Sequence, residues 1–238
     1  MTFDEESRDG KRTYRQSRFT PPPGATEILL VRHGASQPFR PGEPFPLVNG
    51  QGDPSLAPEG REQARRVCRR LAGERLDAVY VSSLRRTAET AEPLVRELGI
   101  EPRVEPDLRE VHLGEWEGGL FRMKVAENDP VARRLFAEER WDVIPGAEPA
   151  EAFAARVRRV IERLAAAHPG ERLAAFTHGA FIAQALALAT RSRPFAFLGA
   201  DNASISHLVV TEERWLVRRY NDTAHLDGAP DASAATLT

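Results

Sequence analysis

The sequence predicts an α/β protein, built as a three-layer α/β/α sandwich with a mostly parallel central sheet and helices on both faces. Short apolar runs alternate along the chain with longer stretches of helical periodicity. Apolar runs are typical of strands that are buried on both faces, and the intervening helices are typical of the crossovers that parallel strands need. Ligands of such a sheet bind where the carboxyl ends of its strands meet.

The first half of the folded chain contains two predicted strands and two predicted helices. Residues 27–31 form an apolar run that reads as a buried strand, and residues 58–73 form an amphipathic helix that begins at Pro58. A second strand is predicted over residues 77–81. A second helix follows over residues 84–98, with its apolar side chains on one face.

The second half of the folded chain contains the remaining predicted helices and strands. A long helix is predicted over residues 148–167, a third buried strand over residues 173–176 and a further helix over about residues 179–190. Residues 204–210 and 215–220 are predicted to form a closing hairpin. The last strands leave a sheet edge that offers a way to form a homodimer.

Composition sets the domain boundaries. Residues 1–24 are polar and end in three prolines, which predicts a disordered tail, and residues 227–238 predict a second one. The folded domain is therefore expected over residues 25–226, with residues 119–145 as a helical lid over the site.

The overall charge and the cysteine content exclude several classes of protein. The net charge is −2, which argues against nucleic-acid binding by bulk charge. The single cysteine, Cys68, cannot form an intramolecular disulfide. There is no apolar run of about 18 residues and no apolar stretch of a secretory signal, so we expect a cytoplasmic protein without a membrane partner.

Polar residues follow three of the predicted strands. The first strand leads into Arg32 and His33, the second leads to the helix that carries Arg85 and Arg86, and the third leads into His178. If these strands are parallel neighbours, the side chains converge at one sheet edge, beside helix N-termini whose free N–H groups point there. A pocket of this kind suits a phosphoryl group.

Two further features bear on the chemistry. A glycine follows each of the two histidines, which allows a ligand to approach the backbone closely. Glu110, Glu115 and Glu117 are candidate proton donors, and their spacing does not choose among them.

Four ordered motifs give the sequence a clear resemblance to the histidine phosphatase superfamily, which has the phosphoglycerate-mutase-like fold. The resemblance covers about residues 26–226. The motifs are Leu30-Val31-Arg32-His33-Gly34, Ser82-Ser83-Leu84-Arg85-Arg86-Thr87-Ala88-Glu89-Thr90-Ala91, Leu108-x-Glu110-x-x-x-Gly114-x-Trp116-Glu117-Gly118 and Thr177-His178-Gly179.

The resemblance implies a role for each matching residue. The nucleophile of the family falls on His33, its acid/base on Glu110, and its phosphate-gripping residues on Arg32, Arg86 and His178. Arg85 is then a neighbour rather than a ligand. The residues expected to border the substrate or the phosphate also include Ser36, Gly179 and His112.

The function implied is that of a metal-independent phosphatase that hydrolyses a small phosphorylated metabolite through a phosphohistidine, with neither a metal nor another cofactor. The Gly-Glu-Trp-Glu-Gly segment after Glu110 resembles the phosphatase branch of the family. The alternatives are phosphoryl transfer of the phosphoglycerate mutase type and a non-catalytic phosphate-binding protein. A lid cation that faces the pocket would bind a second anionic group of the substrate, and the candidates are Arg122, Lys124, Arg133, Arg134 and Arg140.

Overall fold

A computed structural model describes residues 16–227, and its centre is a six-stranded sheet with the strand order β5-β4-β6-β1-β7-β8. The strands β1, β6, β4 and β5 run parallel, and β7 and β8 pair antiparallel at one side. The bounds are Thr26–Arg32 for β1, Ala78–Val81 for β4, Arg103–Val104 for β5, Arg172–Thr177 for β6, Ile205–Val210 for β7 and Trp215–Asp222 for β8.

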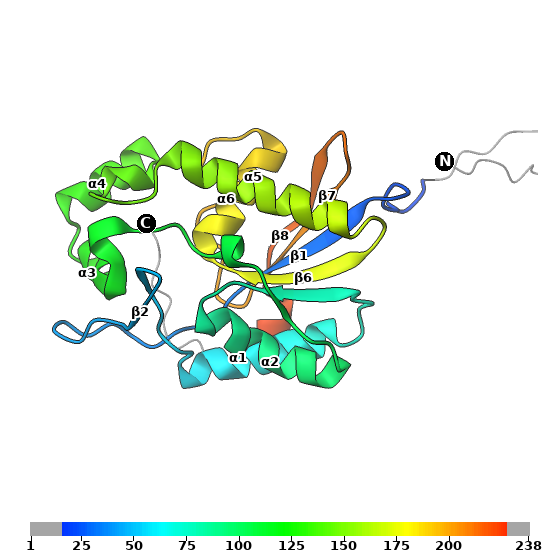
Figure 1. Cartoon of the computed structure of the whole chain (residues 1–238), viewed down its shortest axis with the longest axis horizontal. Coiled ribbons are helices and arrows are strands. Elements are labelled where there is room, and N and C mark those ends of the chain that lie inside the picture. The colour runs from blue at the N-terminus through cyan, green and yellow to red at the C-terminus, as the bar shows by residue number, and fades with distance from the viewer. Residues whose placement is uncertain (1–15, 228–238) are drawn as a thin grey trace, which may run out of the picture.

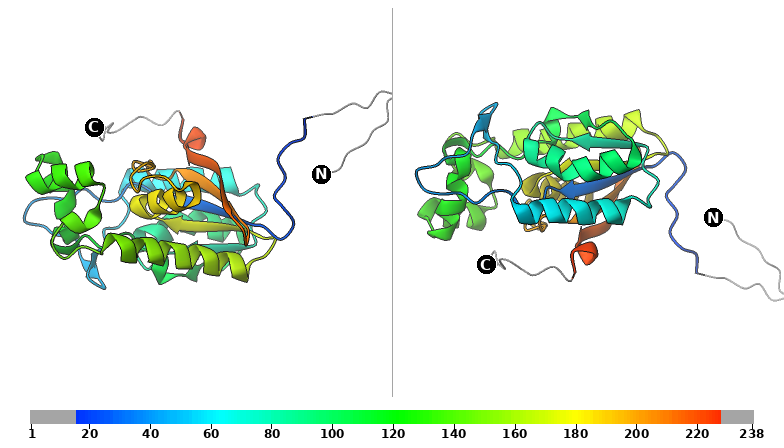
Figure 2. Two further views of the ribbon diagram at one scale, coloured as in Figure 1. Left: turned by 90° about the horizontal axis from the view of Figure 1, so that it is seen from above. Right: turned by 90° about the horizontal axis from the view of Figure 1, so that it is seen from below.

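Helices cover both faces of this sheet, as Figure 1 and the two views of Figure 2 show. The helices α1 and α2 lie on one face, and α5 and α6 lie on the other. Their bounds are Pro58–Leu71 for α1, Arg85–Leu98 for α2, Ala150–Ala167 for α5 and Gly179–Thr190 for α6. The predicted α/β/α sandwich with a mostly parallel sheet is confirmed.

The central strand explains why both faces must be covered. Ile28 and Leu30 of β1 belong to the core beneath α5 and α6, whereas Leu29 and Val31 belong to the core beneath α1 and α2. Successive side chains of a strand point to opposite faces, so an apolar run needs a helical layer on each side.

Several short elements were not predicted. The hairpin of β2 (Leu47–Val48) and β3 (Gln51–Gly52) and the edge strand β5 have two residues per strand, which is too short for a periodic pattern.

The segment expected to form the lid, residues 119–145, contains α3 (Leu120–Ala126), α4 (Pro130–Glu138) and a 3₁₀ turn at Trp141–Val143. In Figures 1 and 2, α3 and α4 lie beyond the carboxyl ends of the parallel strands.

The predicted tails lie mostly outside the described residues, which exclude 1–15 and 228–238. In the described part of the first tail, the ring of Phe19 lies 3.8 Å from the guanidinium carbon of Arg218 on β8. None of the helices between residues 16 and 227 combines the length and the apolar character that a membrane crossing requires.

Candidate active site

The two histidines that follow strands lie side by side at the carboxyl end of the sheet. Because β1 and β6 are parallel neighbours and Arg32 pairs with Thr177, His33 and His178 leave the sheet at the same level. Their ring centroids are 5.2 Å apart, and the ring planes are inclined by 58°. The sequence prediction that these strand ends converge is confirmed.

The tautomer of His33 is fixed by its own backbone. Its Nδ1 lies 2.8 Å from the carbonyl oxygen of Gly34, and a carbonyl only accepts, so Nδ1 carries the proton in this bond. In the neutral ring the lone pair is then on Nε2. Burial, followed by the charges of Arg86 and Arg32, holds the pKa of His33 well below its usual range. His33 is therefore a neutral imidazole at neutral pH, and its Nε2 carries no proton.

His178 lies beneath His33, with no exposed surface. Its Nε2 is 2.8 Å from Ser82 Oγ, while its buried Nδ1 has no hydrogen-bond partner among residues 16–227. Burial, then the charge of Arg86, keeps the pKa of His178 well below the usual value. An unpartnered buried nitrogen is costly unless a ligand takes it up.

The two arginines contribute buried positive charge. Arg86, which is 7% exposed, donates to the Gly52 carbonyl at 2.9 Å, and burial lowers its pKa to about 10. Arg32 donates to the Ala200 carbonyl, and its buried Nε has no partner within the described chain. Arg85 instead pairs with Asp53 at 2.8 Å and points away from the cavity.

Glu110 places a buried carboxyl group close to Arg32 and Arg86. Its oxygens accept hydrogen bonds from the backbone N–H groups of Val111, Ala180 and Phe181, at 3.0, 3.2 and 3.2 Å. Burial raises the pKa of Glu110, although these bonds and the nearby arginines act in the opposite direction. The first turn of α6 was expected to offer free N–H groups to a ligand, and that expectation is wrong for Ala180 and Phe181 because Glu110 occupies them.

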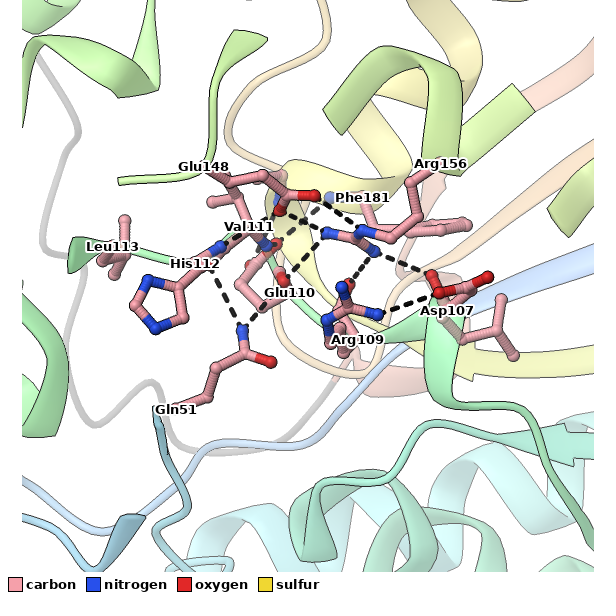
Figure 3. A network of polar contacts seen from close by, with 12 residues as sticks. Gln51, Asp107, Arg109, Glu110, Val111, His112, Leu113, Glu148, Arg156 and Phe181 are labelled. Carbon is pink, nitrogen blue, oxygen red and sulfur yellow. Dashed lines mark hydrogen bonds and ion pairs between the residues drawn. The ribbon is translucent and has the colours of Figure 1, made fainter. Parts of the chain in front are cut away.

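A buried ion pair fixes the loop that carries Glu110 (Figure 3). Arg156 of α5 contacts Glu148 through two hydrogen bonds of 2.8 and 2.7 Å. The same guanidinium donates to the backbone carbonyls of Asp107, Arg109 and Glu110 at 2.8, 2.9 and 3.2 Å. All three carbonyls are thereby tied to one side chain.

Above the charged floor lies a cavity of about 290 Å³. Arg32, His33, Arg86 and Glu110 form its floor. The other lining side chains are mainly apolar and include Phe45, Leu113, Trp116, Phe121 and Trp141. A second cavity of about 440 Å³ adjoins it and shares Arg32, His33 and Arg122.

Ser36, Gly179 and His112 are the predicted residues that remain to be placed, and the first two lie near Arg32 or the second cavity. Ser36 lines the second cavity. Gly179 faces Arg32, whose Nε would lie 3.4 Å from an added Cβ, so this glycine makes room for a guanidinium. Similarly, a Cβ on Gly34 would lie 2.6 Å from the carbonyl oxygen of Gly60, so Gly34 allows the loop to pack on α1 rather than to approach a ligand.

Neither His112 nor His178 is among the residues that line these two cavities, although a phosphate-binding role was expected for both; His178 instead packs against His33 from within the core, whereas His112 is held elsewhere. Its Nδ1 accepts a hydrogen bond from the backbone N–H of Gly114 at 3.0 Å. Figure 3 shows its ring turned away from the Glu148–Arg156 pair. The ring stabilises a turn, and the turn directs it away from the floor.

Of the five lid cations, Arg122 lines the cavities. It donates to the Gln37 carbonyl and to Ser36 Oγ, both at 2.7 Å. The other four bind partners within the lid: Lys124 with Asp129, Arg133 with the Asn128 carbonyl, Arg134 with Glu138 and Arg140 with Asp142.

Sequence reasoning missed Arg156, Gln51 and Asn202. Gln51 donates to the Glu110 carbonyl at 2.9 Å, and Asn202 donates to the His33 carbonyl at 2.9 Å. The sequence does contain a pattern that points to Arg156. It stands three residues after Phe153 and four before Val160, so a charged residue lies on the apolar face of its helix. For the other two the contacts are to backbone atoms far away in sequence.

Comparison with known proteins gives consistent matches. The family model of the histidine phosphatase superfamily (branch 1) matches residues 28–223. Phosphoglycerate mutase-like protein 4 of Arabidopsis thaliana is 32% identical over 208 residues, which cover 84% of this chain and 87% of that protein. A metal-independent phosphoserine phosphatase of the same plant is 32% identical over 205 residues, which cover 84% of this chain and 83% of that protein.

Solved structures match along the same length. The native structure of a mycobacterial glucosyl-3-phosphoglycerate phosphatase has a TM-score of 0.70 at 28% identity and covers 84% of this chain and 100% of that chain. A phosphoglycerate mutase from Bacillus anthracis has a TM-score of 0.71 at 20% identity, with 86% and 96% covered, which shows a shared fold.

We expect replacement of Arg156 to destabilise the protein strongly. Arg156→Met leaves the Glu148 carboxylate and three backbone carbonyls without their buried donor, which costs about 3–5 kcal/mol. Urea unfolding monitored by circular dichroism measures this loss. Arg159→Met, at an exposed position of the same helix, is the control and should change stability by less than about 0.5 kcal/mol. A loss below about 1 kcal/mol for Arg156→Met would contradict the role of the ion pair.

The buried histidines make stability depend on pH. Folding lowers the pKa values of His33 and His178. Their contribution to the free energy of unfolding is therefore fully present above about pH 6.5, which is the pKa of histidine in the unfolded chain. It is lost as the pH falls below that value, by up to about 1.4 kcal/mol per pH unit for each histidine. Urea unfolding at pH 7.5 and 5.5 should show a smaller decline for His33→Gln than for the unsubstituted protein. Equal declines would refute the assignment.

Proposed function

The chain belongs to branch 1 of the histidine phosphatase superfamily and is a phosphoric monoester hydrolase, and we propose that it hydrolyses a small phosphomonoester through a phosphohistidine on His33, without a metal. The observation that carries this proposal is the single tautomer of His33, which presents an unprotonated Nε2 among buried cationic groups. An imidazole in this state is a competent nucleophile at neutral pH.

In the first step, His33 Nε2 forms a bond to phosphorus while the ester P–O bond breaks. Arg32 and Arg86 bind the phosphoryl oxygens and neutralise the charge that they carry in the transition state, and the uncharged His178 donates a hydrogen bond to them. Arg32 Nε and His178 Nδ1 are both buried and without a protein partner in the described chain, so they support this role.

Glu110 moves the proton in both steps. Its raised pKa favours a protonated carboxyl, which donates to the oxygen of the leaving alcohol. The resulting carboxylate then takes a proton from water as the water oxygen attacks phosphorus and the P–N bond breaks. This second step restores neutral His33 and protonated Glu110, and it releases inorganic phosphate.

The relatives differ in the substrates that their names state, since one is a phosphoserine phosphatase and another a glucosyl-3-phosphoglycerate phosphatase. Others are named as probable phosphoglycerate mutases. A mutase returns the phosphoryl group to a second hydroxyl, whereas a phosphatase passes it to water. The fate of the phosphoryl group therefore separates the two functions, and the metal requirement is tested in the same assay.

We expect phosphate release from a panel of phosphomonoesters in the presence of EDTA, and its loss in His33→Ala. The variant removes the nucleophile and so blocks the first step for every substrate. His112→Ala, at a histidine outside the cavities, is the matched control and should remain active. Isomerisation of 3-phosphoglycerate, followed in the same samples, would identify a mutase if it occurs without release. Phosphate release that survives His33→Ala would contradict the mechanism.

Glu110→Gln should separate the two steps with 4-nitrophenyl phosphate. Its leaving group departs without a proton, so phosphorylation proceeds, but hydrolysis slows by about 10²–10⁴-fold because no base activates water. We expect a burst of about one equivalent of 4-nitrophenol per site and an acid-labile phosphoryl group on His33. Glu115→Gln changes an exposed glutamate of the same segment and should retain steady turnover. Normal turnover of Glu110→Gln, or its loss in Glu115→Gln, would assign the acid/base elsewhere.

A further inference from the structure

The cavity above His33 has two chemically different parts. Its floor carries the charged side chains that surround the phosphoryl position. Its wall is formed mainly by aromatic and aliphatic side chains, which would contact the leaving alcohol once a phosphomonoester is bound. The wall therefore contains information on the substrate that is independent of the phosphoryl chemistry.

The aromatic rings of the wall are packed against one another. The ring centroids of Trp116 and Phe121 are 6.3 Å apart, and those of Phe121 and Trp141 are 5.8 Å apart. Trp141 in turn packs on Phe195 at 5.0 Å, behind the wall. Rings held in this way form an apolar surface before a ligand arrives, so a flat or apolar group binds to it without reorganisation.

The polar groups of the wall are already engaged by the protein. Both carboxylate oxygens of Glu117 accept backbone N–H groups, from Gly52 and Leu113, each at 2.8 Å. The amide nitrogen of Gln51 donates to the Glu110 carbonyl. Each oxygen of Glu117 thus helps to hold two segments of the wall together, which fixes this carboxylate in one position.

The charge around the cavity also disfavours a cationic leaving group. Arg32, Arg86 and Arg122 all line it, against Glu110 and Glu117. The three guanidinium groups outnumber the two carboxyl groups, so an ammonium group would meet a surplus of positive charge. Arg122 stacks on Phe45 at 5.2 Å and is bonded to the loop of Ser36, so it completes the wall instead of projecting freely into it.

We infer that this site prefers a phosphomonoester whose leaving alcohol carries a flat or apolar uncharged group, and that it disfavours alcohols that carry an ammonium group. The inference rests on the proposed phosphatase function, because it assigns the wall to the leaving alcohol of that reaction. Within the described chain, the residues that determine the preference are Phe45, Trp116, Phe121 and Trp141, with the three arginines excluding the cation.

The test compares esters of primary alcohols, so that the reactivity of the leaving group stays similar. We would measure kcat/KM of the full chain for 2-phenylethyl phosphate, O-phosphoethanolamine and O-phosphoserine. The expected result is a preference of at least about tenfold for 2-phenylethyl phosphate over both amino compounds, as the contact of one apolar group typically gives. Equal or greater kcat/KM for either amino compound would overturn the inference.

Two variants link the preference to the wall. Phe121→Ala should reduce the ratio of kcat/KM for 2-phenylethyl phosphate to that for O-phosphoethanolamine by about tenfold. Phe136→Ala is the matched control, because Phe136 packs on Phe195 at 6.4 Å and does not line the cavity, so the ratio should stay the same. An unchanged ratio in Phe121→Ala would overturn the assignment of the wall, and circular dichroism verifies that both variants fold.

The failure of this inference is distinguishable from the failure of the proposed function. If O-phosphoserine is the better substrate and its hydrolysis is lost in His33→Ala, the phosphatase mechanism stands and the substrate preference is wrong. If none of the esters releases phosphate in a His33-dependent way, the proposed function itself fails.

Discussion

The ion pair of Arg156 and Glu148 determines where the Glu110 carboxyl group lies. Arg156 reaches from α5 to the segment 107–110 and binds the carbonyls of Asp107, Arg109 and Glu110. With these carbonyls fixed, the Glu110 side chain meets the first turn of α6. A pair that is buried to this degree contributes little net stability compared with apolar residues, so its value lies in the placement of the loop.

The second constraint is the burial of positive charge at the strand ends. Arg32 and Arg86 are held by carbonyl oxygens, which are neutral, and Glu110 is the carboxyl group that faces them. Burial without full compensation is unfavourable for folding. The same imbalance makes the floor complementary to a dianionic phosphoryl group, so the free energy that folding loses there is regained when the substrate binds.

The regular elements and the charged floor could be predicted from the sequence because both are encoded locally. Residues 27–31 read as a buried strand, and the Arg32-His33 and Thr177-His178 pairs come directly after strands, so the sheet order brings them together. His112 was expected to border the phosphate, but it lines neither of the two cavities, and its ring accepts a hydrogen bond from the backbone N–H of Gly114. The contact of Gln51 and the packing of the aromatic rings could not be predicted, since these residues lie in separate short elements whose contacts are long-range and lack any period.

Burial acts on His33 and on Glu110 in opposite chemical senses, and the proposed mechanism needs both effects. Removal from water disfavours the charged form of any group, so it lowers the pKa of His33 and raises that of Glu110. A single buried floor therefore favours a neutral imidazole beside a carboxyl group that holds its proton more tightly than it would in water. A bound phosphoryl dianion would raise the pKa of Glu110 further, while Arg32 and Arg86 offset its effect on His33. Substrate binding would thus help to keep Glu110 protonated without protonating His33, which agrees with the position of both arginines near the histidine.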